Sequence, residues 1–342
     1  MSYALAAIES KVRGENVAGN LRRRATYLYG LNRIAEDPDR WRLLEMDTFN
    51  DLGTQLSDAL SETWGPLTAD LGAATHQGHL RENNEDSYLL MRFGRSLERL
   101  STNLDQNLIE PNYSLTGYGL LVADGMGGMS AGEVASRLAL AKLVELVVNT
   151  SDWILAFRQD KDARTVLKRM TQRFFQIDKI LKDEAQADES LEGMGTTLTV
   201  AGTLGRDLVI GHIGDSRAYL LREQVFKQLT TDHTLGQALI DAGVVSSDDP
   251  VPRSMRHVLT AAIGSLDDRI EPQVLRCKLI SGDQLLLCTD GLTAMLDDEI
   301  IANVLRHEGS AQSACEELID LALGAGGSDN ITVLLARFNS NG

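Results

Sequence analysis

Short apolar runs separated by glycine, asparagine and aspartate turns fill the chain from about residue 68 to its end. Runs of about four to eight residues that are bounded by such turns are typical of β-strands. They predict strands at residues 71–78, 87–92, 118–123, 196–204, 207–214, 216–223, 271–280, 284–291 and 331–338. Residues 93–116 are mostly polar and predict a surface connection between two strands.

Other segments repeat apolar residues every three or four positions, which predicts amphipathic helices. They lie at residues 131–149, 160–187 and 310–324, with a further helix that begins near Asp297. Ser130 and Glu133 form a capping-box pattern at the start of the first helix. Long helices beside many short antiparallel strands predict an α+β sandwich in which helices cover sheets.

Residues 1–66 differ from the rest because their pattern is helical throughout. Asp37 followed by Pro38 is a favourable helix start, and Gly65 followed by Pro66 ends the pattern. Two interpretations stay open for this N-terminal helical extension. It is either a helical hairpin that packs its apolar stripe on the main domain, or a module for regulation or self-association.

Composition restricts the function classes. With 342 residues and 43% hydrophobic residues, the chain can form a packed core as one large domain or two small ones. The formal net charge is −16 and no dense Lys/Arg tract is present. We therefore expect neither nucleic acid nor an anionic membrane as a partner.

The cysteines and the N-terminus predict a cytoplasmic location. Cys277, Cys288 and Cys315 are odd in number and widely spaced, which indicates buried thiols in a reducing compartment. Charges appear too early in residues 1–15 for a signal peptide. The most apolar helical pattern is interrupted by Lys142 and Glu145, so we expect no membrane span.

Acidic residues recur beside glycine, serine or asparagine at the ends of predicted strands. These residues are Glu85, Asp86, Asp124, Asp215, Asp290 and Asp329. Each one alone is compatible with an ordinary turn or helix cap. If folding brings the strand ends together, the carboxylates repel one another, and a divalent ion relieves that repulsion. Ligands that are all oxygen favour Mg²⁺ or Mn²⁺, and the carbonyl of Gly125 is a further candidate.

Two oxygen-bound metal ions that share a carboxylate can activate a water and hold a phosphoryl group. A substrate phosphate also needs a cation, and Arg81 precedes Asp86 in the same turn. A guanidinium matches two phosphate oxygens at once. Arg81 is therefore a candidate phosphate ligand, although a solvated surface arginine is the alternative.

Several of these segments together resemble one known family. Seven motifs follow one another in a fixed order along the chain. They are R-x-x-x-E-D (81–86), VADGMGG (122–128) followed by GEVAS, GTTLTV (195–200), GHIGDSRAYL (211–220), LTTDHT (229–234), CTDGL (288–292) and GGSDNITV (326–333). That order is similar to the metal-dependent serine/threonine protein phosphatases (PPM, type 2C), and above all to their bacterial branch. The resemblance covers residues 68–338 and leaves the first 66 unexplained.

The resemblance implies a central β-sandwich of two antiparallel sheets flanked by pairs of antiparallel helices, in a phosphatase domain at residues 67–342. It further implies that Asp124 bridges two catalytic Mn²⁺ or Mg²⁺ ions, which Glu85, Gly125, Asp290 and Asp329 complete. Asp86 would act through a metal-bound water, Arg81 would bind the substrate phosphate, and Asp215 would hold a third ion. Residues 229–256 would form a flap beside the site. The implied reaction is hydrolysis of phosphoserine or phosphothreonine by a hydroxide that bridges the two metals.

One departure from the family pattern concerns proton transfer. Relatives carry a histidine within or just after the Asp-Gly motif, where this chain has Met126 and Met129. Methionine cannot transfer a proton, so the motif supplies no general acid. His212 and His233 are alternatives, but a structural role is the stronger expectation for each.

The leading hypothesis is an active phosphatase that acts on a phosphorylated protein in kinase signalling. A second hypothesis is a regulatory or binding protein that keeps the fold with weak catalysis. Such proteins usually lose metal carboxylates, whereas this chain has all of those expected. A third hypothesis is a metal-dependent hydrolase of another phosphoester.

Overall fold

The structure is a computed structural model that describes residues 67–105, 112–127, 131–149, 163–245, 252–265, 270–307 and 309–340. The predicted N-terminal extension, residues 1–66, lies outside the described residues. Ser130 of the predicted capping box and Met129 lie outside them as well.

Two sheets form the centre of the described part, and every strand pairing in them is antiparallel. The first sheet has the order β1 (Leu67–His76), β11 (Ile331–Ser340), β10 (Gln284–Cys288), β7 (Arg217–Arg222) and β8 (Val225–Gln228). The second has the order β2 (Asp86–Glu98), β3 (Asn112–Met126), β5 (Leu198–Leu204), β6 (Asp207–Ile213) and β9 (Gln273–Lys278). The short β4 (Gly195–Thr196) pairs with the end of β3.

Strand alternation divides the apolar side chains between the inside of the sandwich and its two outer faces. On β11, Leu334 and Phe338 lie in the core between the sheets, whereas Leu335 packs toward the helices. On β3, Val122 lies in the same central core and Leu121 faces the opposite helices. Because both faces are covered, these strands read as continuous apolar runs in the sequence.

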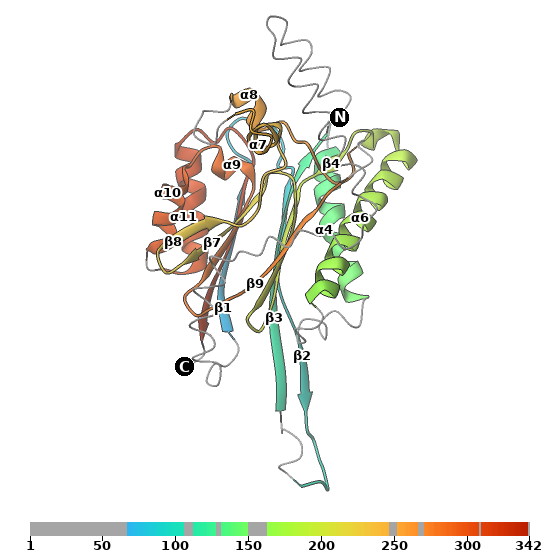
Figure 1. Ribbon diagram of the computed structural model, residues 1–342, viewed down its shortest axis with the longest axis vertical. Helices are drawn as coiled ribbons and strands as arrows, with labels where there is room; N and C mark the ends of the chain where they lie inside the picture. Colours follow the sequence, from blue (N-terminus) through green and yellow to red (C-terminus); the bar gives the residue numbers. More distant parts are fainter. Residues whose placement is uncertain are drawn as a thin grey trace, which may run out of the picture. The chain divides into compact units, whose positions relative to one another are not determined.

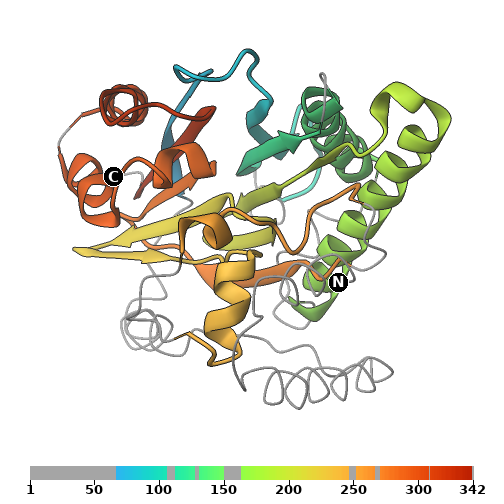
Figure 2. The same ribbon diagram turned by 90° about the horizontal axis from the view of Figure 1, so that it is seen from above.

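A pair of helices covers each outer face. The helices α4 (Ala131–Val148) and α6 (Ala163–Ala187) pack on the second sheet, and α10 (Asp298–Arg306) and α11 (Ala311–Gly324) pack on the first. Both views place these pairs on opposite sides of the two sheets (Figures 1 and 2). Shorter helices are η3 (Glu189–Leu191), α7 (Leu235–Asp241), α8 (Arg253–Arg256) and α9 (Asp290–Thr293). The predicted fold class is confirmed for the described residues.

The prediction of a polar connection at residues 93–116 is wrong at both ends. β2 continues to Glu98 and β3 begins at Asn112, and these two residues face each other in the register. Phe93 and Leu115 pack against a small apolar cluster that includes Val166. This contact explains why the strands persist through a polar stretch, and Figure 1 shows the resulting hairpin extending beyond the other strands.

No helix within the described ranges is long and apolar enough to cross a membrane.

Candidate metal centre

Asp86 and Asp124 face each other on neighbouring strands. Asp86 is the first residue of β2 and lies opposite Asp124 in the β2–β3 register. The backbone of Asp124 is fixed from the other side, because its N–H donates to Thr197 Oγ1 at 2.9 Å and its carbonyl accepts from Thr197 N at 2.9 Å. Thr196 Oγ1 donates to the same carbonyl. Thr196 and Thr197 of the GTT segment therefore orient the backbone of Asp124.

Two glycines allow Glu85 and Gly125 to lie against the start of α4. A Cβ on Gly132 would lie 2.9 Å from Glu85 Cδ and 2.8 Å from the Gly125 carbonyl carbon. A Cβ on Gly125 would lie 2.0 Å from the Gly132 carbonyl oxygen. Ser136 Oγ, one turn along α4, donates to the Glu85 carbonyl at 2.7 Å. The contact between helix and turn therefore requires glycine at both positions.

Asp290 and Asp329 approach from the first sheet. Asp290 follows β10 and opens α9, while Asp329 lies in the turn before β11. Asn330 joins this turn to the β1–β2 connection: its side chain donates to the carbonyls of Gln77 and Asn83 and accepts from Glu85 N. The predicted ligands of both sheets are thereby held at one end of the sandwich.

Arg81 lies in the same connection, with its Nη2 2.7 Å from Asp329 Oδ2. The hydrogen bond that Arg81 donates to Asp329 raises the pKa of Arg81, and the charges of Asp124 and Asp290 add to this effect. The predicted phosphate ligand is therefore close enough to the predicted metal ligands to sense their charge.

Burial and mutual repulsion disfavour the ionised forms of the carboxylates at this end of the sandwich when no cation is present. Burial, followed by the charges of Asp86 and Asp290, raises the pKa of Asp124 well above its usual value. Burial raises the pKa of Asp86 to about 7 and the pKa of Asp215 to about 8. Burial also raises the pKa of Glu85. A divalent ion would replace the lost hydration and offset the repulsion.

The hydrogen bonds of Asp86 leave one oxygen for a further ligand. Thr289 and Thr332 donate to its Oδ2 at 2.8 and 2.7 Å. Its Oδ1 is buried and accepts no hydrogen bond from any residue that the structure describes. A buried carboxylate oxygen without a donor is costly, and a cation or an ordered water would satisfy it. Together with the all-oxygen ligand set, this orphaned atom fits a hard divalent metal.

A histidine that the sequence reasoning missed joins this cluster. Ligand atoms of Asp215, His257 and Asp290 all lie within 4.8 Å of one another. His257 Nδ1 is 3.2 Å from Asp290 Oδ2. Asp215 lies in the β6–β7 turn and His257 directly follows α8, so only the fold brings them together. No residue pattern around His257 indicated this position.

The two histidines considered as alternative proton donors are engaged elsewhere. The ring nitrogens of His212 contact Thr199 Oγ1 at 2.8 Å and the Thr231 carbonyl at 3.2 Å. His233 stacks on His212 with ring centroids 5.0 Å apart, and its Nδ1 accepts from Gly214 N. These contacts assign both rings to the structure around the Asp215 turn.

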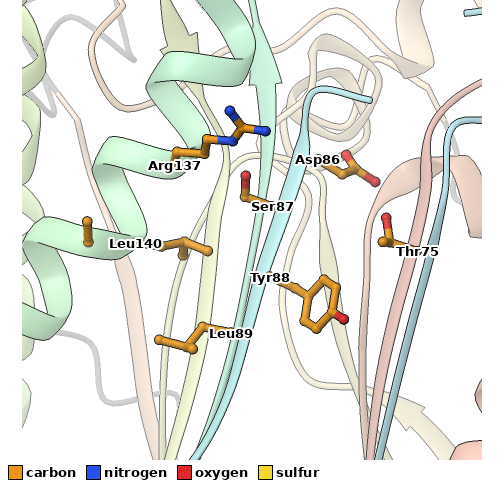
Figure 3. Close-up of a pocket in the computed structure, with 8 residues that line it drawn as sticks. Thr75, Asp86, Ser87, Tyr88, Leu89, Arg137 and Leu140 are labelled. Carbon is orange, nitrogen blue, oxygen red and sulfur yellow. The ribbon is translucent and has the colours of Figure 1, made fainter. Parts of the chain in front are cut away.

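A pocket of about 380 Å³ lies beside the candidate metal centre, on both sides of β2. In Figure 3, Asp86 and Tyr88 lie on the side of Thr75, whereas Ser87 and Leu89 point toward α4. Of the predicted ligands, Asp86 alone lines this pocket. It therefore borders the carboxylate cluster and is not its centre.

The chain is similar in sequence to bacterial protein phosphatases. Residues 113–322 match the family model described as protein phosphatase 2C. Serine/threonine phosphatase stp of Listeria innocua is 33% identical over 265 residues, which make up 78% of this chain and 94% of that protein. Serine/threonine protein phosphatase PstP of Mycobacterium tuberculosis is 35% identical over 242 residues, which make up 70% of this chain and 44% of that protein.

Solved structures of such phosphatases have a similar fold. The crystal structure of M. tuberculosis PstP/Ppp aligns with a TM-score of 0.61 and 31% identity, covering 79% of this chain and 99% of that one. The catalytic domain of PstP in complex with two manganese ions aligns with a TM-score of 0.61 and 31% identity, covering 80% and 99%. The S. agalactiae serine/threonine phosphatase aligns with a TM-score of 0.63 and 28% identity, covering 79% and 99%.

Proposed function

The chain belongs to the protein phosphatase 2C family, and on this premise we propose that the carboxylates around Asp124 form its catalytic metal centre. The protein is a metal-dependent serine/threonine protein phosphatase, and its substrates are phosphoproteins. The assignment of individual residues to steps of the reaction is our proposal. It rests on the contacts of each side chain and on its match to the family motifs.

In this proposal Asp124 is shared between two divalent ions, with Asp290 and Asp329 on one and Glu85 and the Gly125 carbonyl on the other. The orphaned Oδ1 of Asp86 supports a ligand at the cluster, and Asp86 would accept a hydrogen bond from a water there. Two bound Mn²⁺ or Mg²⁺ ions supply Lewis acidity, which activates a water for attack and neutralises phosphate charge. Asp215 would help to hold a third ion.

The protein's own residues position the substrate. We assign Arg81 to the phosphate, because its guanidinium is at the cluster and has only the Asp329 carboxylate as an ion-pair partner among the described residues. On substrate binding the guanidinium would turn from Asp329 toward two phosphate oxygens. Met126 lies at the end of β3, opposite Gly195 in the β3–β4 register, and it cannot donate a proton to the leaving group.

The observation that carries this proposal is the pairing of Asp86 with Asp124 at the end of the β2–β3 ladder. Two buried carboxylates held there repel each other when ionised, so a bound cation stabilises their ionised forms. Calorimetric titration with Mn²⁺ tests it: the full-length protein should bind at least two ions, and Asp124→Asn should lose the tight ones. Unchanged stoichiometry and affinity in Asp124→Asn would refute the bridging role.

The domain assignment is also part of the proposal. Residues 67–342 would form the phosphatase domain, with a flap at about residues 229–256, and residues 1–66 would be a helical extension for regulation or self-association. The helical pattern of residues 1–66 and their lack of Gly-Asp or Asp-Gly pairs support a role outside catalysis. A cytoplasmic location and a substrate in kinase signalling fit the reduced cysteines and the family. Removal of residues 1–66, followed by mass and activity measurements, separates regulation from self-association.

A further inference from the structure

Asp215 is a buried carboxylate in the turn between β6 and β7. The residue is 6% exposed, yet within the described residues no other side chain or backbone N–H donates a hydrogen bond to its carboxylate. Burial and the charge of Asp290 raise its pKa above the usual value, although a hydrogen bond from its own backbone lowers that pKa. A buried carboxylate in this state is expected to have a cationic ligand or a cationic neighbour.

His257 faces this carboxylate together with Asp290. Its Nδ1 lies 3.2 Å from Asp290 Oδ2, and one ligand atom from each of the three residues fits within 4.8 Å. Two ligands about 2.1–2.3 Å from an ion and at right angles around it lie roughly 3 Å apart. The spacing therefore suits neighbouring ligands of one ion as well as it suits a simple hydrogen bond.

The backbone around His257 connects this position to the predicted flap. His257 is the C-cap of α8. The residues after it form the stem of the flap, where Leu235 N donates to the Val258 carbonyl and Thr260 N donates to the His233 carbonyl. His233 is in turn bound to Gly214, the residue before Asp215, through both its N–H and its ring. The segment that carries His257 is therefore bonded, through His233, to the residue before Asp215.

We propose that His257 is a nitrogen ligand of the divalent ion held by Asp215 and Asp290, and that this ion ties the flap stem to the metal centre. The inference rests on the proposed function, since Asp290 is also assigned to a catalytic ion. It adds a ligand that the family motifs do not contain. With an imidazole beside two carboxylates, the site should favour Mn²⁺ over Mg²⁺ more strongly than a site made of oxygen alone.

The direct test is pulsed electron paramagnetic resonance of the full-length protein loaded with Mn²⁺. A coordinated imidazole gives nitrogen modulation of the electron spin echo, which an all-oxygen site lacks. We expect this modulation in the wild type, and its loss in both His257→Ala and His257→Gln. The glutamine variant can still donate a hydrogen bond to Asp290, so it separates ligation from the ion pair. His79→Ala is the matched control, because His79 lies near Gly327 at the same end of the sandwich but not with Asp215.

Binding measurements separate this inference from the proposed function. In His257→Ala the weakest Mn²⁺ should bind more than about tenfold less tightly, with the tighter ions unchanged. Asp215→Asn should give the same loss. Absent modulation in the wild type, or modulation that persists in His257→Ala, overturns the inference alone. A wild type that binds no Mn²⁺ contradicts both the inference and the metal centre.

Hydrogen exchange of the flap stem gives a second measurement. Mn²⁺ should slow exchange of the amides at residues 255–260 in the wild type, because the ion would hold the end of α8. The same Mn²⁺ concentration should slow it less in His257→Ala. Equal protection in the two proteins would show that His257 does not tie the flap stem to an ion.

Discussion

Arg81 Nη2 lies 2.7 Å from Asp329 Oδ2, so the proposed phosphate ligand forms an ion pair with a proposed metal ligand. Both side chains are partly exposed, and an exposed pair of this kind is weak. It can therefore open without large cost when a phosphate group competes for the guanidinium. The pair keeps Arg81 near the cluster before substrate binds.

Removal of this guanidinium should weaken substrate capture. Hydrogen bonds to charged groups contribute about 1.5–3 kcal/mol, so Arg81→Ala should lower kcat/KM by about 10- to 100-fold. Arg81→Lys keeps the charge without the two-pronged donor and should recover part of the loss. The measurement is steady-state hydrolysis of a phosphothreonine peptide with Mn²⁺. Arg306→Ala is the control, since Arg306 contacts Glu299, Asn303 and Gln224. A value of kcat/KM equal to that of the wild type would remove Arg81 from the phosphate site.

The raised pKa values of Asp86 and Asp215 predict how pH affects the metal-free protein. Burial raises these values to about 7 and about 8, whereas an unfolded aspartate titrates near 3.9. Between these limits the folded state binds more protons than the unfolded state, so stability falls as pH rises. Each group can contribute up to about 1.4 kcal/mol per pH unit. In chelator, Tm should therefore be lower at pH 8 than at pH 6.

Added Mn²⁺ should reverse this trend, because protons compete with the metal for the same carboxylates. The increase in Tm on adding Mn²⁺ should be larger at pH 8 than at pH 6. Asp215→Asn should reduce the pH dependence of the metal-free protein, and Asp320→Asn, at an exposed position of α11, should not. If Tm in chelator is the same at both pH values for the wild type, the carboxylates are not repelling one another as described.

Gly132 controls the distance between α4 and the Glu85 turn. In Gly132→Ala the new Cβ would overlap Glu85 Cδ and the Gly125 carbonyl carbon, at 2.9 and 2.8 Å. One ligand must then move, and we expect Mn²⁺ affinity to fall by about 10- to 100-fold. Gly324→Ala in α11 is the matched control, because its Cβ would meet no atom within 4 Å. Calorimetry that finds the same affinity in Gly132→Ala and the wild type would contradict the packing argument.

The absence of a histidine in the Asp-Gly motif predicts a dependence on the leaving group. Met126 cannot protonate the departing oxygen, and both nitrogens of His212 contact other residues. A serine alkoxide needs that proton, whereas a nitrophenolate leaves without it. We expect kcat for aryl phosphates to fall as the phenol becomes more basic, and to be lowest for a phosphoserine peptide. Equal kcat on p-nitrophenyl phosphate and the peptide would show that a general acid is present.

Sequence and structure agree most closely where one short motif contains both a candidate ligand and the glycine of a turn. Asp124 and Asp290 each precede a glycine at a strand end, so the motif itself pointed to a site. The strands around them are predictable because both of their faces are apolar. The helices are predictable from their caps and apolar stripes, as the N-cap Ser310 of α11 and the buried Phe174 of α6 show.

What the sequence did not reveal depends on contacts between distant segments. Thr289 and Thr332 both donate to Asp86, although more than 200 residues separate each of them from it. His257 meets Asp215 and Asp290 only in the folded chain, because the three residues lie far apart in the sequence. The β2–β3 hairpin was missed because Phe93 and Leu115 are isolated apolar residues in a polar stretch, and their packing on Val166 gave no local pattern.

The central claim is that phosphate hydrolysis depends on divalent ions bridged by Asp124. Phosphate release from a phosphothreonine peptide measures this most directly, with Mn²⁺, with excess chelator, and with Asp124→Asn and Asp290→Asn beside the wild type. We predict release by the wild type with Mn²⁺, loss of release in chelator with recovery when Mn²⁺ is restored, and a decrease of at least about 100-fold in both variants. Release that ignores the chelator, or that survives both substitutions, would contradict the account.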